Sequence, residues 1–312
     1  MNRFTALAAI LLASTAAATA APANFVYTSA GELAAAQTIL ERADIAGAQV
    51  VYNWKRLEPT EGIYDFSAIE EDLARTDALG KKLFIQVQDR FFSPDARNIP
   101  AYLLEDPKYG GGLVEQIEDG KTEGYGWTTM QWRPEVRARY QALLTALAAR
   151  FDGKVYGVNL PETAIDVTED RPDAGFSCDA YFAAELDNLT AARAAFQHSV
   201  VVQYVNFWPC EWDNDHAYMS RLFEFAQAHD IGLGGPDIVP WRKGQMKNSY
   251  PFFNQYKGKL PFVGMAVQEP TLDYINDKTG KPFTKDEFVD FATDYLGVDA
   301  VFWSTETPWL NQ

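Results

Sequence analysis

Strand-like and helix-like segments alternate along almost the whole chain, and this alternation restricts the possible folds more than any other feature. Eight short apolar segments are typical of buried strands, and they span residues 23–28, 47–54, 81–88, 154–159, 199–207, 231–235, 261–268 and 299–304. Seven segments with helical periodicity lie between them, at residues 31–44, 65–80, 133–151, 179–196, 215–230, 250–256 and 284–297. Alternation of this kind predicts right-handed βαβ units and a parallel sheet.

The number of repeated units favours a closed barrel over an open sheet. Eight βα units fit a single (β/α)8 TIM barrel of the α/β class, a fold that typically takes about 250 residues. We therefore expect one catalytic barrel domain over residues 21–312. A doubly wound open sheet is the alternative, but eight strands are many for it, and no G-x-G-x-x-G motif follows a strand. The long segment at residues 91–132 is expected to be an irregular loop that builds part of a substrate groove.

The N-terminus has the pattern of a secretory signal peptide. Arg3 is followed by an apolar run and then by small residues, with an A-x-A cleavage site at residues 18–20. We predict that residues 1–20 are removed and that the mature protein is secreted or periplasmic. A membrane anchor is the alternative, but the apolar run is short and interrupted by hydroxyl residues. No later stretch approaches the roughly 20 apolar residues that span a bilayer.

The charge of the chain restricts its partners. Asp and Glu number 43 against 27 Lys and Arg, which gives a net charge of -16. A field of this sign repels phosphate backbones, so nucleic acid is not an expected partner. Anionic polysaccharides are disfavoured for the same reason, although a local basic groove could override the net charge. We expect a monomer with a carbohydrate substrate.

The only two cysteines fall in loops that follow neighbouring predicted strands. Cys178 lies after the fourth strand and Cys210 after the fifth. In an exported protein such a pair can oxidise to a disulfide, which would stiffen one wall of the barrel mouth. Two buried free thiols are the alternative.

Two glutamates occupy the positions at which a barrel enzyme carries its chemistry. Active sites of (β/α)8 barrels lie at the C-terminal ends of the strands. Glu162 stands just past the fourth predicted strand, and Glu269 stands just past the seventh. Two carboxyl groups on opposite sides of one mouth are what cleavage of a glycosidic bond requires, one as an acid and one as a nucleophile or base. For Glu162 alone, the simpler interpretation is an acidic residue at the start of a helix.

One segment carries a specific resemblance to a known group of enzymes. Residues 53–73, with the sequence NWKRLEPTEGIYDFSAIEEDL, closely resemble the W-x-x-L-E-P-x-x-G-x-Y-D-F-S segment of clan A glycoside hydrolases. These are retaining (β/α)8 families that include β-galactosidases, xylanases and β-xylosidases. Residues 99–106 resemble the P-x-W-L stretch after the third strand, with Tyr102 in place of Trp. The resemblance implies that Glu162 is the acid/base and Glu269 the nucleophile of a double displacement, with carboxyls about 5–5.5 Å apart.

The sequence departs from the clan at one position. The clan usually has Asn directly before the acid/base, to hold the 2-hydroxyl of the sugar, whereas this chain has Pro161 there. Asn159 or Asn206 could take that role. Amide, charged and indole groups near the other strand ends are candidates for contacts with sugar hydroxyls and ring faces. The expected substrate-binding residues are Trp54, Gln88, Arg90, Asn159, Asn206, Trp208, Trp241, Trp303 and Glu306.

Other chemistries find little support in the sequence. The three histidines are scattered and form no H-E-x-x-H motif, so we expect no catalytic metal and no cofactor. No G-x-S-x-G elbow is present. The sequence thus predicts an exported retaining glycoside hydrolase that acts on a β-linked glycan. A barrel that binds a glycan or a partner without catalysis, and an inverting hydrolase, remain the alternatives.

Overall fold

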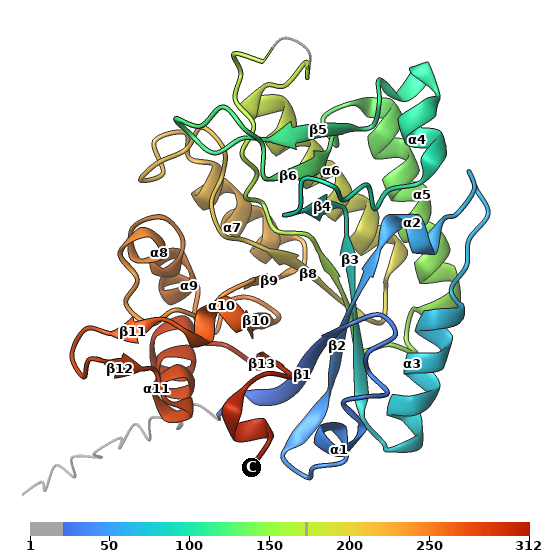
Figure 1. Cartoon of the computed structure of the whole chain (residues 1–312). Coiled ribbons are helices and arrows are strands. Elements are labelled where there is room, and N and C mark those ends of the chain that lie inside the picture. Colours follow the sequence, from blue (N-terminus) through green and yellow to red (C-terminus); the bar gives the residue numbers. More distant parts are fainter. Residues whose placement is uncertain (1–20, 172–173) are drawn as a thin grey trace, which may run out of the picture.

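The fold of the chain is given by a computed structural model, which describes residues 21–171 and 174–312. Eight parallel strands close into a barrel in the order β1-β13-β10-β9-β8-β7-β3-β2 (Figure 1). Their bounds are β1 Ala23–Ser29, β2 Ile45–Asn53, β3 Lys82–Gln88, β7 Gly157–Leu160, β8 Val200–Tyr204, β9 Gly232–Gly235, β10 Val263–Val267 and β13 Ala300–Ser304. The predicted (β/α)8 barrel and the location of all eight strands are confirmed.

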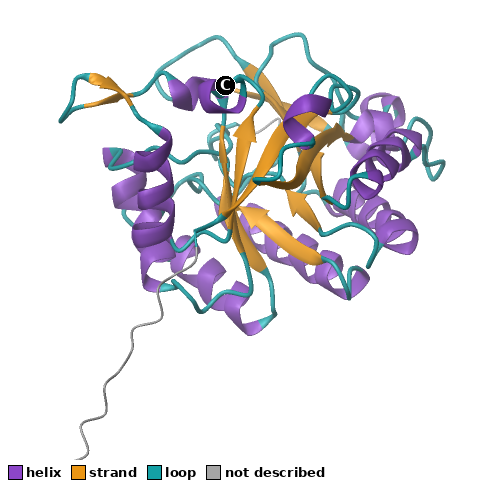
Figure 2. Cartoon of the chain, turned by 90° about the horizontal axis from the view of Figure 1, so that it is seen from below, coloured by secondary structure: helices purple, strands orange, loops and turns teal. Residues whose placement is uncertain are grey.

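Helices surround the strands, and Figure 2 shows them on both sides of the barrel. The helices are α1 Gln37–Leu40, α2 Trp54–Leu57, α3 Ser67–Ala78, α4 Ala101–Glu105, α5 Pro134–Phe151, α6 Cys178–Ala195, α7 Tyr218–Ala228, α8 Lys243–Asn248, α9 Tyr250–Gln255, α10 Glu269–Leu272 and α11 Lys285–Asp290. A π-helical turn at Phe291–Leu296 continues α11, and short 3-10 turns lie at Pro107–Tyr109 and Pro308–Leu310. Pro134 occupies the first turn of α5, where its missing N–H removes no intrahelical bond.

The first predicted helix, at residues 31–44, is mostly a series of tight turns. Only α1 is helical, and the preceding turns close by bonds from residue i to residue i−3, such as Ala36 N to Leu33 O at 3.2 Å. Leu33, Ala36 and Ile39 are buried, and this spacing of three residues matches a 3-10 arrangement better than an α-helix. The segment still packs its apolar side chains against the barrel.

The long segment after β3 is more ordered than the sequence predicted. It contains a three-stranded antiparallel sheet in the order β4-β6-β5, with bounds β4 Arg90–Phe91, β5 Leu113–Gln116 and β6 Gly126–Thr129. A second small sheet, a hairpin of β11 Ile275–Asn276 and β12 Lys281–Pro282, follows α10. Both lie beyond the C-terminal ends of the barrel strands, where they extend the mouth (Figure 1).

The barrel interior changes from apolar to polar toward the mouth. Aromatic rings fill the lower part, where Phe84 lies 5.1 Å from Phe302 and 5.6 Å from Phe25 between ring centroids. Glycine is required beside these rings, because a Cβ on Gly157 would come within 2.3 Å of the Phe84 ring. Above this layer the buried interior side chains are polar, and they include Gln49, Gln86, Asn159 and Tyr204. A polar layer of this kind forms the floor of a hydrated site.

Two expectations concern the ends of the chain and its relation to membranes. The predicted signal peptide, residues 1–20, lies outside the described residues. Within residues 21–171 and 174–312, no helix is long and apolar enough to cross a membrane.

Candidate active site

A cavity of about 310 Å³ opens at the C-terminal ends of β7, β8, β9 and β10. This volume lies at the lower end of the range of ligand pockets, roughly 300–1,000 Å³. Acidic, amide and aromatic side chains line it, and they include Glu162, Asp166, Asn206, Asp237, Gln268, Phe92, Tyr125 and Tyr274. The cavity is therefore a polar pocket with an aromatic wall, located where barrel enzymes carry their active sites.

The backbone of the loop after β7 places Glu162 in this cavity. β7 ends at Leu160, and α6 begins only at Cys178, so Glu162 does not start a helix. The Glu162 carbonyl oxygen accepts a hydrogen bond from the guanidinium group of Arg90, and the next residue, Thr163, donates its N–H to Tyr204 O at 3.1 Å. The side chain then receives a hydrogen bond from the Asn206 amide, with 3.4 Å between Nδ2 and Oε2.

The surroundings of Glu162 favour its protonated form. The pKa of Glu162 is raised to about 7. Burial is the largest cause, and the negative charge of Asp237 is the largest contribution from a neighbouring residue. The positive charge of Arg90 and the hydrogen bond from Asn206 act in the opposite direction. A carboxyl group with a pKa near the working pH can give up a proton and take it back, which is the property of a general acid/base.

Asp237 is a third carboxylate in this region, which the sequence analysis did not single out. It follows β9, and its Oδ1 accepts a hydrogen bond from Thr271 Oγ1 at 2.7 Å. The hydroxyl of Tyr250 donates a hydrogen bond to the backbone carbonyl of Asp237 at 3.0 Å. Burial raises the pKa of Asp237, while Thr271 and the charge of Arg242 lower it.

Glu269 begins α10, between two residues that line the cavity, Gln268 and Pro270. Its side chain is exposed, and its Oε1 accepts a hydrogen bond from the hydroxyl of Ser304 at the end of β13. The strands β10 and β13 are neighbours in the barrel, which brings these two residues together. Glu269 thus lies at the rim of the pocket with its carboxylate held from one side.

Tyr27, on β1, connects the three carboxylates electrostatically. Burial raises the pKa of the Tyr27 hydroxyl, and the negative charges of Glu269, Asp237 and Glu162 add to this effect in that order. Tyr27 is adjacent to Gln49 and Ser304 in the strand register, so it belongs to the upper layer of the barrel. All three acids therefore act electrostatically on one hydroxyl group at the barrel mouth.

Arg90, expected to bind substrate, instead forms the centre of a buried network behind the site. Its side chain is 1 % exposed and pairs with Asp89 at 2.9 Å and with Glu185 at 3.3 Å. It also donates a hydrogen bond to the hydroxyl of Tyr181 at 2.9 Å, in addition to its bond to the Glu162 carbonyl. A side chain this deeply buried does not reach a sugar in the cavity. Its position supports the backbone of Glu162.

Three of the expected tryptophans point away from the mouth, which corrects their assignment as substrate contacts. Trp303 is fully buried and donates its indole N–H to Asn24 Oδ1 at 2.8 Å, because alternation along β13 turns Phe302 and Ser304 inward and Trp303 outward. Trp54 is also fully buried and packs on α5. Trp208 is 4 % exposed and packs among rings of α6 and α7.

The other expected binding residues have mixed positions. Asn159 is fully buried in the barrel interior, where its Nδ2 donates to the Leu160 carbonyl at 3.2 Å. Gln88 is partly exposed and donates its Nε2 to the carbonyl of Arg90 at 2.8 Å. Glu306 is exposed in the turn after β13. Asn206 lines the cavity with Glu162, and Trp241 lines a neighbouring groove.

The loop after β3 contributes an aromatic wall that the sequence did not locate by residue. Phe92 and Tyr125 line the cavity, with their rings stacked at a centroid separation of 6.3 Å and an angle of 5°. The hydroxyl of Tyr125 donates a hydrogen bond to Asp166, on the loop after β7. Two loops that are distant in sequence are thus joined at the edge of the pocket.

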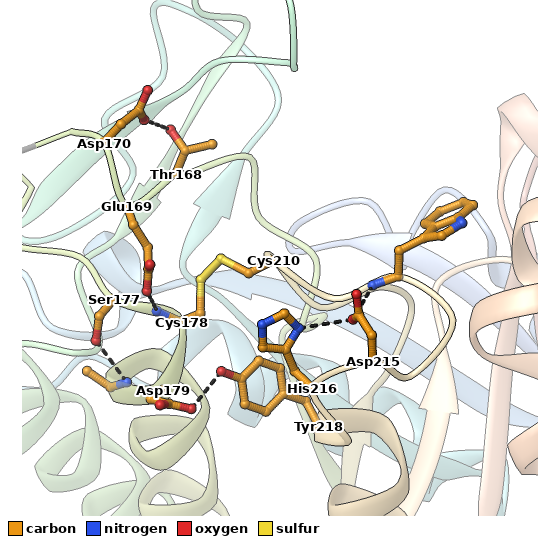
Figure 3. Close-up of a disulfide and its surroundings, with 12 residues drawn as sticks. Thr168, Glu169, Asp170, Ser177, Cys178, Asp179, Cys210, Asp215, His216 and Tyr218 are labelled. Carbon is orange, nitrogen blue, oxygen red and sulfur yellow. Dashed lines mark hydrogen bonds and ion pairs between the residues drawn. A yellow bond between two sulfur atoms is a disulfide. The ribbon is translucent and has the colours of Figure 1, made fainter.

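A disulfide between Cys178 and Cys210 joins the loops that carry Glu162 and Asn206 (Figure 3). The Cα atoms are 6.2 Å apart, within the usual range for a disulfide. The Cys178 N–H donates to Glu169 Oε1 at 2.9 Å, and α6 begins at the same place with Ser177 as its N-cap. The predicted pairing is present, and because it consumes both thiolates, the cluster with Glu169 does not offer a metal ion thiolate ligands.

Several solved structures resemble the closed parallel barrel of this chain. The catalytic domain of a β-amylase from Paenibacillus polymyxa aligns with a TM-score of 0.60 at 8% sequence identity, over 91% of this chain and 93% of that one. A psychrophilic family 10 endo-β-1,4-xylanase aligns with a TM-score of 0.53 at 11% identity, over 93% and 89% of the two chains.

A third similar structure is the lactosyl-enzyme intermediate of endo-glycoceramidase II from Rhodococcus sp.. It aligns with a TM-score of 0.54 at 13% identity, over 93% of this chain and 74% of that one. No protein-family model matches the sequence, and no curated protein sequence matches it. At these identities the comparisons establish the fold, and the chemistry of the site has to be argued from its own residues.

Proposed function

We propose that this protein is an exported glycoside hydrolase that cleaves a β-linked glycan with retention of anomeric configuration. The observation that carries the proposal is the raised pKa of Glu162, about 7, in a pocket at the barrel mouth. A carboxyl group that keeps its proton at neutral pH can protonate the oxygen of a leaving sugar. Glu269, at the rim of the same pocket, supplies the second carboxylate that such a reaction needs.

In the first step Glu162 donates its proton to the glycosidic oxygen, and the Glu269 carboxylate attacks the anomeric carbon from the opposite face. The bond from the anomeric carbon to the glycosidic oxygen breaks, and the leaving sugar departs as an alcohol that carries the proton from Glu162. A covalent ester between the sugar and Glu269 remains.

In the second step the ionised Glu162 removes a proton from a water molecule, and the water oxygen attacks the anomeric carbon. The ester bond to Glu269 breaks, the sugar is released with its original configuration, and Glu162 holds a proton again. Asn206, which donates a hydrogen bond to Glu162 Oε2, is suited to orient this carboxyl in both steps.

The test is release of reducing sugar from a panel of β-glucans, xylans, mannans, galactans and bacterial exopolysaccharides. Wild type is compared with Glu162→Gln and Glu269→Gln, each checked for folding by circular dichroism. Activity on one glycan that is lost in both folded variants supports the assignment. Asp237→Asn is included because Asp237 also lines the pocket and has the largest charge effect of any neighbour on the pKa of Glu162.

The stereochemistry of the first product separates the alternatives. The configuration of the first product is measured by NMR of its anomeric proton. Retention supports double displacement, whereas inversion would indicate single displacement, with Glu162 as the acid and a second carboxylate as the base that activates water. Glycan binding without cleavage by the wild type would instead support a binding barrel. Loss of activity in Asp237→Asn, with Glu269→Gln still active, would move the second role from Glu269 to Asp237.

A further inference from the structure

A second and larger hollow adjoins the catalytic cavity and is continuous with it. This hollow, called the basic groove below, has a volume of about 620 Å³. It lies between the loop after β9, which leads into α8, and the β11–β12 hairpin, and both elements extend the same side of the mouth (Figure 1). Val239, Gln245 and Tyr274 line both the basic groove and the cavity that contains Glu162.

One wall of the basic groove is an exposed tryptophan held in an unusual conformation. Trp241 is 55% exposed, and its φ of 63° places it in the left-handed region, which residues with a Cβ rarely adopt. Edge contacts with Phe291 and Tyr295, at 4.9 and 5.5 Å between ring centroids, fix the indole from behind. Strained residues are concentrated at functional sites, and exposed indole faces are suited to stacking on pyranose rings.

The charge of the basic groove is opposite to that of the whole protein. Arg242, Lys243 and Lys278 line it, against a single carboxylate, Asp277, in a chain with a net charge of -16. Within the described residues, none of the three cations has a carboxylate oxygen within 4.0 Å. Arg242 stacks on the ring of Tyr274 at 4.1 Å, and Lys278 lies 5.9 Å from the centre of the Trp241 indole.

The second carboxylate near these cations belongs to the catalytic cavity. The positive charge of Arg242 lowers the pKa of Asp237, so Arg242 acts on the catalytic cavity although its side chain lines the basic groove. Lys243 and Lys278 have no such partner and are exposed to solvent. Two of the three cations are therefore available to an anion that enters from outside.

We propose that the basic groove is a subsite for a sugar that carries an anionic group, either a uronate carboxylate or a sulfate ester. The pyranose ring stacks against Trp241, and its anionic group lies between Lys243 and Lys278. This inference rests on the proposed function, because it treats the basic groove and the cavity as one substrate cleft. The overall negative charge disfavours acidic polysaccharides, and this local groove is the feature that overrides it.

The experiment measures binding of acidic glycans to the mature Glu162→Gln variant, which holds substrate without cleaving it. Glucuronoxylan, hyaluronan and alginate test the carboxylate, each against its carboxyl-reduced form. Chondroitin sulfate and carrageenan test the sulfate, each against its desulfated form. We expect at least one acidic glycan to bind about tenfold more tightly than its neutralised counterpart at low salt, and this preference to weaken as salt is raised.

The double variant Lys243→Gln/Lys278→Gln, made in the Glu162→Gln background, is expected to lose the preference for the acidic glycan. Each lysine should account for a roughly three- to fivefold difference in Kd. Lys259→Gln is the matched control, since this exposed lysine precedes β10 at the opposite end of the barrel. Equal binding of acidic and neutralised glycans, binding of none of the acidic glycans, or equal losses in the control would overturn the proposal. If the anionic subsite is overturned in this way, cleavage of a neutral glycan by wild type would still support the proposed hydrolase function. Conversely, charge-dependent binding of a glycan that wild type does not cleave would support the anionic subsite and contradict the hydrolase function.

Discussion

The side chains of Glu162 and Asp237 line the same cavity, and the charge of Asp237 contributes more than that of any other neighbour to the raised pKa of Glu162. Asp237 itself is partly buried and is held by a hydrogen bond from Thr271, so this repulsion is built into the fold rather than supplied by a mobile group. The pair has the pattern of two acids whose environments separate their roles, with the proton held mainly by one of them.

Asp237→Asn should move the alkaline limb of the pH profile of kcat/KM to lower pH. Removing the negative charge removes a cause of the raised pKa of Glu162, so Glu162 loses its proton at a lower pH. We expect a displacement of roughly half a pH unit or more, with folding and the acidic limb retained. The measurement is initial rate against pH on the glycan found by the substrate panel.

Asp166→Asn is the matched control, because Asp166 also raises the pKa of Glu162 but contributes least among its named neighbours. Its displacement should be the smaller of the two. An unchanged alkaline limb in Asp237→Asn would show that Asp237 does not control the protonation of Glu162.

The loss of activity in Glu162→Gln should depend on how much the leaving group needs to be protonated in order to depart. On a natural glycan the loss should be about a thousandfold, since general acid catalysis contributes roughly 10²–10⁴. On an aryl glycoside with a dinitrophenolate leaving group, which departs without a proton, the first step should be nearly as fast as in wild type. Glu269→Gln should be inactive on both substrates. Equal losses on both substrates in Glu162→Gln would contradict its assignment as the acid.

The sequence was sufficient for the fold because each strand and most helices carry their own local signal. The segment that resembles clan A glycoside hydrolases supports the fold rather than the chemistry. Glu58 of that segment is buried and accepts hydrogen bonds from the Trp54 indole at 2.8 Å, from Gly62 N at 2.8 Å and from Arg139. Its residues therefore tie the loop after β2 to α5 in this protein.

The site was only partly predictable because side-chain direction depends on strand parity and on packing. A shift of one residue along β13 decides whether Trp303 faces the mouth or the helices, and only the structure gives that parity. Asp237 was not predicted, because the glutamates after β7 and β10 already fit the expected pair and Asp237 follows the short glycine-rich strand β9. Arg90 carries a guanidinium group suited to binding sugar hydroxyls, and only its burial in the structure assigns it to the network behind Glu162.

Arg90→Met should destabilise the protein strongly, because it leaves Asp89 and Glu185 buried without a cation. We expect a loss of about 3–5 kcal/mol in the free energy of unfolding, measured by urea denaturation. Arg150→Met is the matched control, since Arg150 makes an exposed ion pair with Glu70 and should lose less than about 1 kcal/mol. Similar losses in the two variants would mean that the buried network does not hold this wall of the barrel.

Replacing both cysteines by serine should lower stability and weaken the site together. The disulfide closes a loop with a sequence separation of 32 residues, for which chain entropy gives roughly 3–4 kcal/mol. Because the two joined loops carry Glu162 and Asn206, we also expect KM to rise more than kcat falls. Thermal unfolding and steady-state kinetics with and without a reductant test this, and a wild-type protein unaffected by reduction would contradict it.

Glu162→Gln should stabilise the protein at alkaline pH while it removes activity. The pKa of Glu162 is about 7 in the folded protein and near 4.5 in the unfolded chain. Between these values only the folded state holds the proton, so the free energy of unfolding of the wild type falls as pH rises through this window. Ionisation of Glu162 in the folded protein lowers the free energy of unfolding by roughly 3 kcal/mol well above pH 7, and it has no effect below about pH 4.5. Urea unfolding at pH 4, 6 and 8 should therefore show the variant gaining on the wild type as pH rises. A constant difference across this range would mean that Glu162 titrates alike in both states, and the raised pKa would then no longer support its role as the acid.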